Sequence, residues 1–452
     1  MIGITSFGAY VPIYRLDRQE IARAWAGRAQ PGEKAVANCD EDSLTMGVEA
    51  AYDCLQGVDR DTVEGVYFAS TSPPYQRKGA ASILAPAADL RQDIFTADFT
   101  DSVRSGTSAL RAALDAVKAG SAKQVLVVAS DRSIPAPASE QEMTFGDGAA
   151  ALLIGEGDVA VNIAGSYTIS SEFMDLWKRD RGDTYFRTWE DRFITTHGYM
   201  ELTQRAVTGL MKKYELQPRD FARAAVYGPD PRSHTALLRS LGFDAKTQVA
   251  DPLFATVGNT GAAHSLMTLA GALEEAKPGD RILLAGYGDG ADAFILEVQE
   301  GIEKLRGKRG IKGNLASKLP LPNYEKYLRF RRLVEFEPER RPPDQSALTV
   351  LWRESSQVLR FHGGKCRGCG TIQFPIQRVC GVCRSREYDE VPLADKKATL
   401  FTFSLDERAM VLDPPNVTSI VDFDGGGRFY CTLTDRDPGQ VQVGMRVEMT
   451  FR

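Results

Sequence analysis

Over the first 300 residues, short continuous apolar runs alternate with longer segments whose apolar residues recur every three or four positions. VLVVAS, from Val125, and ILLAGY, from Ile282, are continuous runs rich in branched residues, which is typical of buried strands. The segments before them have helical periodicity and end at Gly120 and Gly279. This alternation predicts a mixed α/β fold with both faces of its sheets covered.

The same order of elements occurs twice. SGTSALRAALDAVKAGSAKQVLVVAS, from Ser105, parallels TGAAHSLMTLAGALEEAKPGDRILLAGY, from Thr260, and a weaker match pairs the segments that begin at Leu44 and Leu202. Each copy also reaches a GDGA tetrapeptide, in FGDGAAALLIG and in YGDGADAFILEV. Chance similarity of generic α/β units is the alternative, but a duplicated layered α/β fold explains the matched order better. We therefore predict an N-terminal half over residues 1–157 and a C-terminal half over residues 158–300.

The pattern changes after residue 300. Residues 301–350 begin with the basic, Gly- and Pro-containing stretch KLRGKRGIKGNLASKLPLP, which favours a linker, and continue with a short helix in NYEKYLRFRRLVEF. From residue 351 onward, apolar and polar residues alternate in short runs separated by turns. This pattern predicts small β modules, which we place at residues 351–390 and 391–452.

Four of the seven cysteines lie close together in the first of these modules. KCRGCGTIQFPIQRVCGVC places Cys366, Cys369, Cys380 and Cys383 as two C-x2-C pairs, a spacing that presents four thiolates to one tetrahedral metal ion. We predict structural Zn²⁺ in a zinc ribbon. An iron–sulfur cluster and a ribbon that has lost its metal are the alternatives.

Composition narrows the classes of function. The net charge is −5, and the C-terminal modules carry nearly equal numbers of basic and acidic residues, which argues against a nucleic-acid partner. We see no apolar run long enough for a transmembrane helix and no signal peptide, so no membrane partner is expected. Clustered cysteines without a disulfide framework favour a cytoplasmic protein.

The repeated halves, the two GDGA turns and GNTGAA at Gly258 resemble the thiolase superfamily. Within it, residues 1–300 resemble hydroxymethylglutaryl-CoA synthase and ketoacyl synthase III. The C-terminal modules resemble the zinc-ribbon/OB-fold family associated with acyl-CoA enzymes. The resemblance implies an αβαβα fold followed by a zinc ribbon and an OB-fold barrel, a CoA thioester as substrate and a homodimer.

The catalytic positions of that superfamily carry over unevenly. The cysteine nucleophile at the start of a buried helix falls on Val103, which cannot form a thioester. The glutamate of hydroxymethylglutaryl-CoA synthase falls on Thr71, and the histidine falls on Tyr227. The asparagine is retained as Asn259. The family's oxyanion hole uses backbone N–H groups, so the resemblance assigns those roles to the Val103 amide and to the glycine turn at Gly288.

Several residues remain candidates for proton transfer and substrate binding. Tyr227, His264, Tyr287 and His234 are the acid/base candidates, although His264 has an alternative as a cap or packing residue and His234 lies in what is expected to be a surface turn. Ser102 and Ser105 are expected to cap the helix. The charged, aromatic stretch Trp177–Met200 is a substrate cap or a solvated helix. The expected substrate contacts are Thr71, Arg104, Arg187, Glu190, Arg192 and Tyr287, with Lys304–Lys318 as a further candidate for CoA phosphates.

These observations favour an enzyme that makes or breaks a C–C bond in an acyl-CoA thioester by aldol or retro-aldol chemistry, without an acyl-cysteine. The two-part type that the chain resembles includes a steroid side-chain aldolase that lacks this cysteine. One alternative is a hydroxymethylglutaryl-CoA synthase-like acyltransferase that carries out a Claisen-type condensation. Another is a catalytically silent acyl-CoA-binding scaffold.

Overall fold

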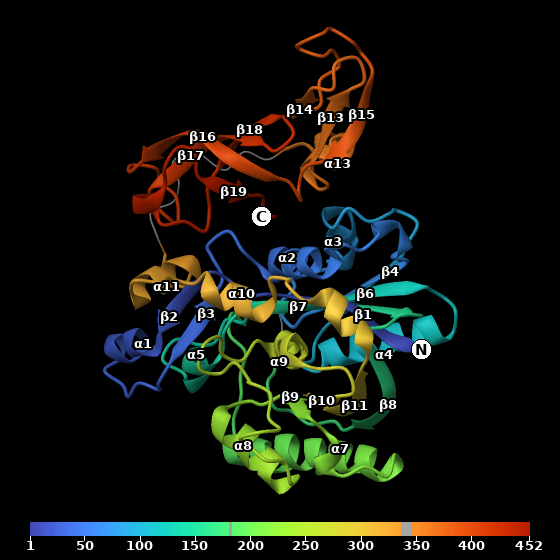
Figure 1. The fold of residues 1–452 in the computed structure, drawn as a ribbon. Coiled ribbons are helices and arrows are strands. Elements are labelled where there is room, and N and C mark those ends of the chain that lie inside the picture. The colour runs from blue at the N-terminus through green and yellow to red at the C-terminus, as the bar shows by residue number, and fades with distance from the viewer. Residues whose placement is uncertain (180–182, 336–345) are drawn as a thin grey trace. The chain divides into compact units, whose positions relative to one another are not determined.

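The computed structural model describes residues 1–179, 183–335 and 346–452 (Figure 1). The chain divides into two compact units: unit 1 is Met1–Ala85 with Leu90–Tyr327, and unit 2 is Pro86–Asp89 with Leu328–Arg452. Among the described residues, no helix has the length and apolar character needed to cross a bilayer.

Unit 1 is built on one nine-stranded sheet with a pseudo-symmetric order, β5-β4-β6-β7-β1-β8-β11-β10-β9. The two copies of the repeat meet where β1 pairs antiparallel with β8, and on each side two more antiparallel pairings lead outward to a parallel pair, β4 with β6 or β9 with β10. The duplication predicted from the sequence is therefore present in the sheet. The strands are β1 (Ile2–Tyr10), β4 (Gly65–Ala69), β5 (Phe95–Phe99), β6 (Gln124–Asp131), β7 (Gly148–Glu156), β8 (Val161–Ser170), β9 (Arg223–Val226), β10 (Arg281–Tyr287) and β11 (Gly290–Val298).

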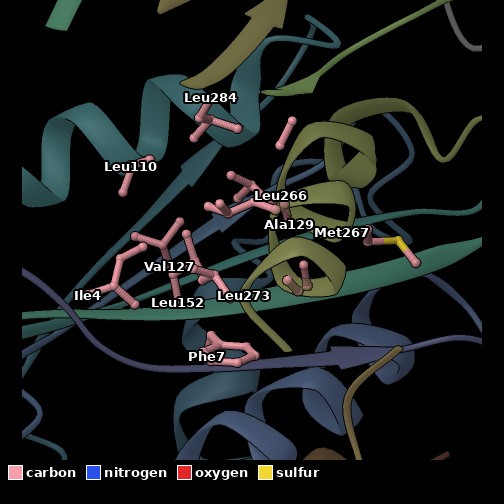
Figure 2. Packing of buried hydrophobic residues seen from close by; sticks show 14 of the residues in the cluster. Ile4, Phe7, Leu110, Val127, Ala129, Leu152, Leu266, Met267, Leu273 and Leu284 are labelled. Atoms are coloured by element: carbon pink, nitrogen blue, oxygen red, sulfur yellow. The ribbon is translucent and has the colours of Figure 1, made fainter. Parts of the chain in front are cut away.

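Helices cover the sheet in matched pairs. α2 (Ser43–Leu55) packs on β1 and β7, while its counterpart α7 (Glu201–Lys213) packs on β8 and β11. α4 (Ser105–Lys118) and α9 (His264–Glu275) contact each other and share one large apolar core with the strands (Figure 2). The other helices that begin before residue 300 are α1 (Arg18–Ala24), α3 (Ala81–Ala87), α5 (Glu140–Thr144), α6 (Asp191–Phe193), α8 (Pro231–Ser240), η1 (Arg60–Thr62), η2 (Ile194–Met200), η3 (Pro218–Asp220) and η4 (Gly261–Ala263).

The start of the predicted linker is part of unit 1. Its elements are η5 (Glu300–Leu305), α10 (Gly310–Ala316), β12 (Leu319–Pro320) and the first residues of α11 (Tyr324–Phe330), and β12 joins a small sheet with β2 (Tyr14–Asp17) and β3 (Glu33–Val36). The Lys308 ammonium group donates to the Ser6 hydroxyl and to the backbone oxygens of Phe7, Asp53 and Cys54. Residues 301–327 are therefore docked on the fold. The last part of the predicted linker, residues 336–345, lies outside the described residues.

Unit 2 contains two small sheets after α12 (Leu348–Arg353) and α13 (Ser355–Val358). β13 (His362–Cys366) lies between β14 (Ile372–Gln373) and β15 (Tyr388–Pro392), which is the ribbon. The barrel strands follow as β16 (Lys397–Asp406), β17 (Asn416–Phe423), β18 (Arg428–Thr432) and β19 (Arg446–Glu448), with η6 (Pro438–Gln440) before the last strand. β17 alternates strictly between buried and half-buried positions, as predicted for one face on a core.

Candidate functional site

The loop between β5 and α4 carries Val103 at the position expected for a nucleophile. Val103 is half-buried and packs at the edge of an apolar cluster with Tyr287. Among the described residues its backbone N–H has no hydrogen-bond partner. The Ser102 hydroxyl accepts from the Arg104 N–H at 3.3 Å, and the buried Ser105 hydroxyl has no partner in the described structure. Since α4 begins without a side-chain cap hydrogen bond, the expectation that these serines cap the helix is wrong.

The turn between β10 and β11 lies directly against this loop. Gly288 has φ of +138°, and a Cβ atom there would lie 2.8–2.9 Å from Ser102 Oγ, Arg104 N and Val103 Cγ2. Only glycine therefore allows the turn to approach the loop so closely. The Gly288 N–H itself donates to the Gly290 carbonyl at 3.1 Å, so in this conformation it is not free to act as the oxyanion donor assigned to it.

Asn259 is fully buried, and its side chain joins two loops. Its amide nitrogen donates to the Tyr227 hydroxyl at 3.1 Å and to the Gly228 carbonyl at 3.2 Å, while its carbonyl accepts from the Gly261 N–H at 2.9 Å. These bonds fix the phenol of Tyr227 directly beside Asn259. The structure thus brings together two of the predicted catalytic residues.

Aromatic rings surround the Tyr227 phenol. The centroid of the His264 ring lies 5.6 Å from that of Tyr227, and the Tyr287 centroid lies 6.1 Å from it. Burial raises the pKa of Tyr227 far above its ordinary value and lowers the pKa of His264 to about 3. At neutral pH the site therefore holds a neutral phenol and a neutral imidazole, which suits hydrogen-bond donation better than charge stabilisation.

The expectation that His234 lies in a surface turn is wrong. His234 belongs to α8 and is only 3% exposed, because the segment after Pro231 begins a helix capped by the Asp230 carboxylate. Burial lowers the pKa of His234 to about 4. Its ring contacts Phe254, which in turn stacks on His264.

A buried carboxylate, Asp131, connects two loops of the site by hydrogen bonds. It accepts from the N–H and the hydroxyl of Thr71 at 2.7 and 2.8 Å, and from the Ala262 N–H at 2.7 Å. Asp131 therefore ties the Thr71 loop to the loop that carries Asn259. Sequence reasoning missed Asp131, although a carboxylate at the end of the buried run VLVVAS is a signal that could have found it.

Other residues predicted to bind substrate either pair with groups of the protein itself or lie away from Asn259 and Tyr227. Arg104 donates to the Ile169 carbonyl at 2.9 Å and lies 3.7 Å from the Asp292 carboxylate. Arg187, Glu190 and Arg192 are exposed around the start of α6, and Arg187 pairs with Asp183 at 2.7 Å. In the described residues, the structure does not bring these three side chains to Asn259 or Tyr227.

The basic residues of Lys304–Lys318 are also engaged within unit 1. Lys304 pairs with Asp158, Lys312 with Glu275 at 2.9 Å, and Lys318 with Glu33 at 2.6 Å. In the structure, this segment therefore does not present a free basic surface for CoA phosphates.

The aromatic stretch Trp177–Met200 reaches the site through its last turn. η2 is a π-helical turn, a feature that is frequent at functional sites. The Tyr199 hydroxyl donates to the Tyr227 carbonyl at 2.9 Å, and a Cβ atom at Gly198 would lie 2.5 Å from the Tyr287 hydroxyl. Within this stretch, Gly198 and Tyr199 thus lie against the site; residues 180–182 lie outside the described structure.

The four cysteines of unit 2 converge as predicted. All four Sγ atoms lie within 4.8 Å of one another, with Cys366 and Cys383 at 3.4 Å and Cys369 and Cys380 at 3.6 Å. Tetrahedral Zn–S bonds of about 2.3 Å place neighbouring sulfurs roughly 3.8 Å apart, so this donor set fits zinc.

Four segments of the chain match models of known families. Residues 97–172 match the family 3-oxoacyl-[acyl-carrier-protein] synthase III, and residues 211–297 match the C-terminal part of that family. Residues 357–389 match the rubredoxin-like zinc ribbon domain of ChsH2, and residues 390–452 match its C-terminal OB-fold domain. The predicted zinc ribbon and OB-fold are confirmed.

Curated relatives cover most of unit 1. The hydroxymethylglutaryl-CoA synthase of Pyrococcus horikoshii is 33% identical over 342 residues, which are 74% of this chain and 94% of that protein. The enzyme of the same name from Methanosarcina mazei is 34% identical over 344 residues, 73% of this chain and 98% of that protein. These relatives agree better with the predicted synthase-like condensation than with the aldolase prediction.

Solved structures share the fold. A hydroxymethylglutaryl-CoA synthase complexed with CoA has a TM-score of 0.67 at 21% identity, covering 76% of this chain and 92% of that one. MvaS in complex with 3-hydroxy-3-methylglutaryl coenzyme A has a TM-score of 0.63 at 23% identity, covering 76% and 95%. The thiolase-like fold of unit 1 is thereby confirmed, and the chain belongs to the hydroxymethylglutaryl-CoA synthase family.

Proposed function

We propose that unit 1 condenses acyl units carried as CoA thioesters, as a hydroxymethylglutaryl-CoA synthase does, but without an acyl-cysteine at position 103. The observation that carries this proposal is the buried Asn259–Tyr227 pair, in a chain that aligns with nearly the full length of its curated relatives. A scaffold that only bound acyl-CoA would not need these two side chains to be locked together.

The chemistry follows from the groups present. An enolate of the acyl-CoA forms when a general base takes a proton from the α-carbon, and the thioester oxygen then carries negative charge. The Val103 N–H, which has no partner in the described structure, is a preorganised donor for that oxygen. The enolate carbon attacks the carbonyl carbon of a second substrate, which is bound without a covalent link to residue 103.

Aldol cleavage or formation is the second candidate, and two observations favour it. Val103 replaces the thiol that acyl transfer to the enzyme requires, and the Tyr227 phenol stands where the family has its histidine. A β-hydroxyacyl-CoA would be split by the reverse of the same carbon–carbon step. The two candidates differ in substrates and share the site.

A product assay tests the proposal. The full chain is incubated with acetyl-CoA and acetoacetyl-CoA, with acetyl-CoA and propionaldehyde, and with β-hydroxyacyl-CoA esters, and CoA esters are identified by mass spectrometry. Condensed product from the first mixture supports the synthase proposal, and turnover of only the other mixtures supports the aldolase candidate. No turnover despite saturable binding would leave the scaffold alternative.

Intact-protein mass spectrometry on the same samples tests the missing covalent step. We expect no acyl adduct on unit 1. An adduct on Ser102 or on a cysteine would overturn the non-covalent part of the proposal, while an Asn259→Ala variant should lose product without changing the adduct result.

We further propose that Cys366, Cys369, Cys380 and Cys383 bind one structural Zn²⁺. A site closed by four sulfurs leaves no position for substrate, so zinc would stabilise unit 2 and take no part in the reaction. Purified protein should contain one zinc per chain by elemental analysis, and the Cys366→Ser variant should contain markedly less.

The homodimer implied by the resemblance is part of this proposal, and its test is the mass measured by light scattering.

A further inference from the structure

The side-chain amide of Asn259 has no hydrogen left to donate to a substrate. Its nitrogen, Nδ2, carries two hydrogens. It donates to the Tyr227 hydroxyl at 3.1 Å and to the Gly228 carbonyl at 3.2 Å, and the Pro229 carbonyl lies at 3.5 Å as a further acceptor. Both hydrogens are therefore used inside the protein, and in this conformation Asn259 cannot serve as a direct donor to a substrate oxygen.

The orientation of this amide follows from its backbone partners. The Gly228 carbonyl can only accept a hydrogen bond, and the Gly261 N–H, which lies 2.9 Å from Asn259 Oδ1, can only donate one. Rotating the amide by half a turn would place oxygen against a carbonyl and nitrogen against an N–H. Asn259 Nδ2 therefore faces Tyr227, and the Tyr227 oxygen is the acceptor in the bond between them.

The hydroxyl proton of Tyr227 must then go to a group other than Asn259, and the described residues provide no acceptor for it. The His264 ring, whose centroid lies 5.6 Å from that of Tyr227, accepts from the Thr260 N–H through Nδ1 at 3.4 Å. A neutral ring then carries its proton on Nε2, which cannot accept another. The hydroxyl of Tyr287, on the other neighbouring ring, makes no hydrogen bond in the described structure.

The free proton of Tyr227 is a buried donor. Tyr227 is only 2% exposed, and a buried donor without an acceptor is a costly arrangement that a substrate oxygen would relieve. Burial also raises the pKa of Tyr227, so the hydroxyl keeps this proton at neutral pH. Val103, whose N–H likewise has no partner in the described structure, packs against the same apolar cluster. The cluster thus has two donors at its disposal, one from backbone and one from a side chain.

From these bonds we infer that Tyr227 is a catalytic residue, which donates a hydrogen bond to the carbonyl oxygen of the second substrate, and that Asn259 is a positioning residue, which acts only through Tyr227. The inference rests on the proposed function, since it assigns two roles within that reaction. It also divides the work between the two donors, because the Val103 N–H remains the donor to the thioester oxygen.

The step needs no reactant beyond water. As the enolate carbon bonds to the carbonyl carbon of the second substrate, the carbonyl π electrons move to its oxygen. The Tyr227 hydroxyl stabilises the negative charge on that oxygen through a hydrogen bond and keeps its own proton. Water protonates the oxygen as the product leaves. The Asn259 N–H occupies a lone pair of the phenol oxygen throughout, which holds the hydroxyl in one orientation.

The bond between the two side chains is tested first, independently of turnover. 3-Fluorotyrosine is placed at position 227, and its ¹⁹F resonance is recorded at neutral pH. Asn259→Ser should shift the resonance, because serine can still accept from the Gly261 N–H but is too short to reach the Tyr227 oxygen. Asn162→Ser is the matched control, since this asparagine donates to Glu297 at 3.2 Å, and it should leave the resonance unchanged. A resonance unchanged by Asn259→Ser would overturn the inference.

The role of Tyr227 is tested on the substrate pair that the wild-type protein converts. Tyr227→Phe keeps the ring and should lower kcat about 100-fold with little change in KM, the loss typical of one oxyanion donor. Tyr214→Phe is the matched control, because it removes another phenol oxygen, which accepts from the Ser166 N–H at 3.3 Å, and its kcat should equal that of wild type. Equal kcat values for the two variants would contradict a catalytic Tyr227.

The role of Asn259 is tested by combining the variants. Asn259→Ser alone should lower kcat about tenfold, because the Tyr227 hydroxyl loses its fixed orientation. If Asn259 acts only through Tyr227, Asn259→Ser should cost nothing further when Tyr227 is already phenylalanine. A further tenfold loss in the double variant would mean that Asn259 acts on the substrate directly, and its positioning role would be overturned.

The two levels of proposal fail in different ways. If wild-type protein converts none of the substrate pairs, the proposed function falls and both assigned roles fall with it. If wild-type protein is active and Tyr227→Phe and Tyr214→Phe behave alike, the further inference alone falls.

Discussion

The two GDGA turns show how one tetrapeptide has come to serve two purposes. In the first copy, Gly146 donates to the Asn259 carbonyl, and the buried Asp147 carboxylate accepts from the Ala37 N–H at 2.6 Å. In the second copy, Gly288 lies against the Val103 loop, and Asp289 is exposed with φ of +46°. The first turn stabilises the fold, and the second packs against the loop of the candidate site. A repeat therefore identifies a fold, while its two copies need not share a function.

The strongest test of this difference adds a methyl group to the first turn, at Gly146. A Cβ atom at Gly146 would lie 1.8 Å from the Val257 carbonyl oxygen, and backbone on both sides would have to move. Gly146→Ala should lower the free energy of unfolding by about 4 kcal/mol or more. Denaturant titration or the yield of folded protein measures this. A folded, stable Gly146→Ala variant would show that the first turn is not structural.

The same change in the second turn should affect catalysis more than folding. Gly288→Ala would push against the Val103 loop and displace the Val103 N–H, so we expect about a 100-fold loss in kcat/KM with the fold retained. Gly279→Ala is the matched control, because it has φ of +90° but no atom within 4 Å of a new Cβ. Similar activities of the two variants would contradict the assignment of the second turn to the site.

The helices α4 and α9 differ in how they should affect the pH dependence of stability. His264 of α9 occupies the repeat position that Ala109 holds in α4. Its pKa is lowered to about 3 by burial, so between about pH 6.5 and pH 3 the unfolded chain binds a proton that the folded chain does not. Stability should therefore fall as the pH falls through this window, with His264 contributing up to about 1.4 kcal/mol per pH unit.

His264→Ala should make that pH dependence shallower, whatever the variant does to stability at neutral pH. Urea titrations at several pH values from 6.5 to 4.5 give the two slopes. Parallel slopes for the variant and wild type would mean that His264 is protonated in the folded state.

The smallest expected difference separates the two aspartates. Asp147→Asn weakens a buried hydrogen bond to the Ala37 N–H and should cost about 1–3 kcal/mol, whereas Asp289→Asn changes an exposed residue and should stay within about 0.5 kcal/mol. Thermal unfolding of both variants side by side measures the difference. An equal effect would remove the structural distinction between the turns.

Sequence reasoning predicted best what depends on short spacing. The C-x2-C pairs predicted the ribbon, and the duplicated segments predicted the duplication that the nine-stranded sheet shows, because each pattern lies within a single stretch of chain. Val103, Tyr227 and Asn259 were placed by resemblance, and the structure joins Asn259 to Tyr227.

What the sequence could not show depends on contacts between distant loops. Asp131 bonds across 131 residues to Ala262. Arg104 and the lysines of Lys304–Lys318 looked available for substrate because their partners, such as Asp292 and Glu275, are far away in the chain. Charge alone does not tell a free cation from a paired one.

The anchoring of Lys308 has a practical consequence for dissecting the chain. An expression fragment cut at residue 300, where the repeat ends, would lose the ammonium group that satisfies the carbonyl oxygens of Phe7, Asp53 and Cys54, and with it the strand that edges β2. A cut after residue 327 keeps both. A fragment that keeps unit 1 intact therefore includes η5, α10, β12 and the first residues of α11 beyond the duplicated sequence.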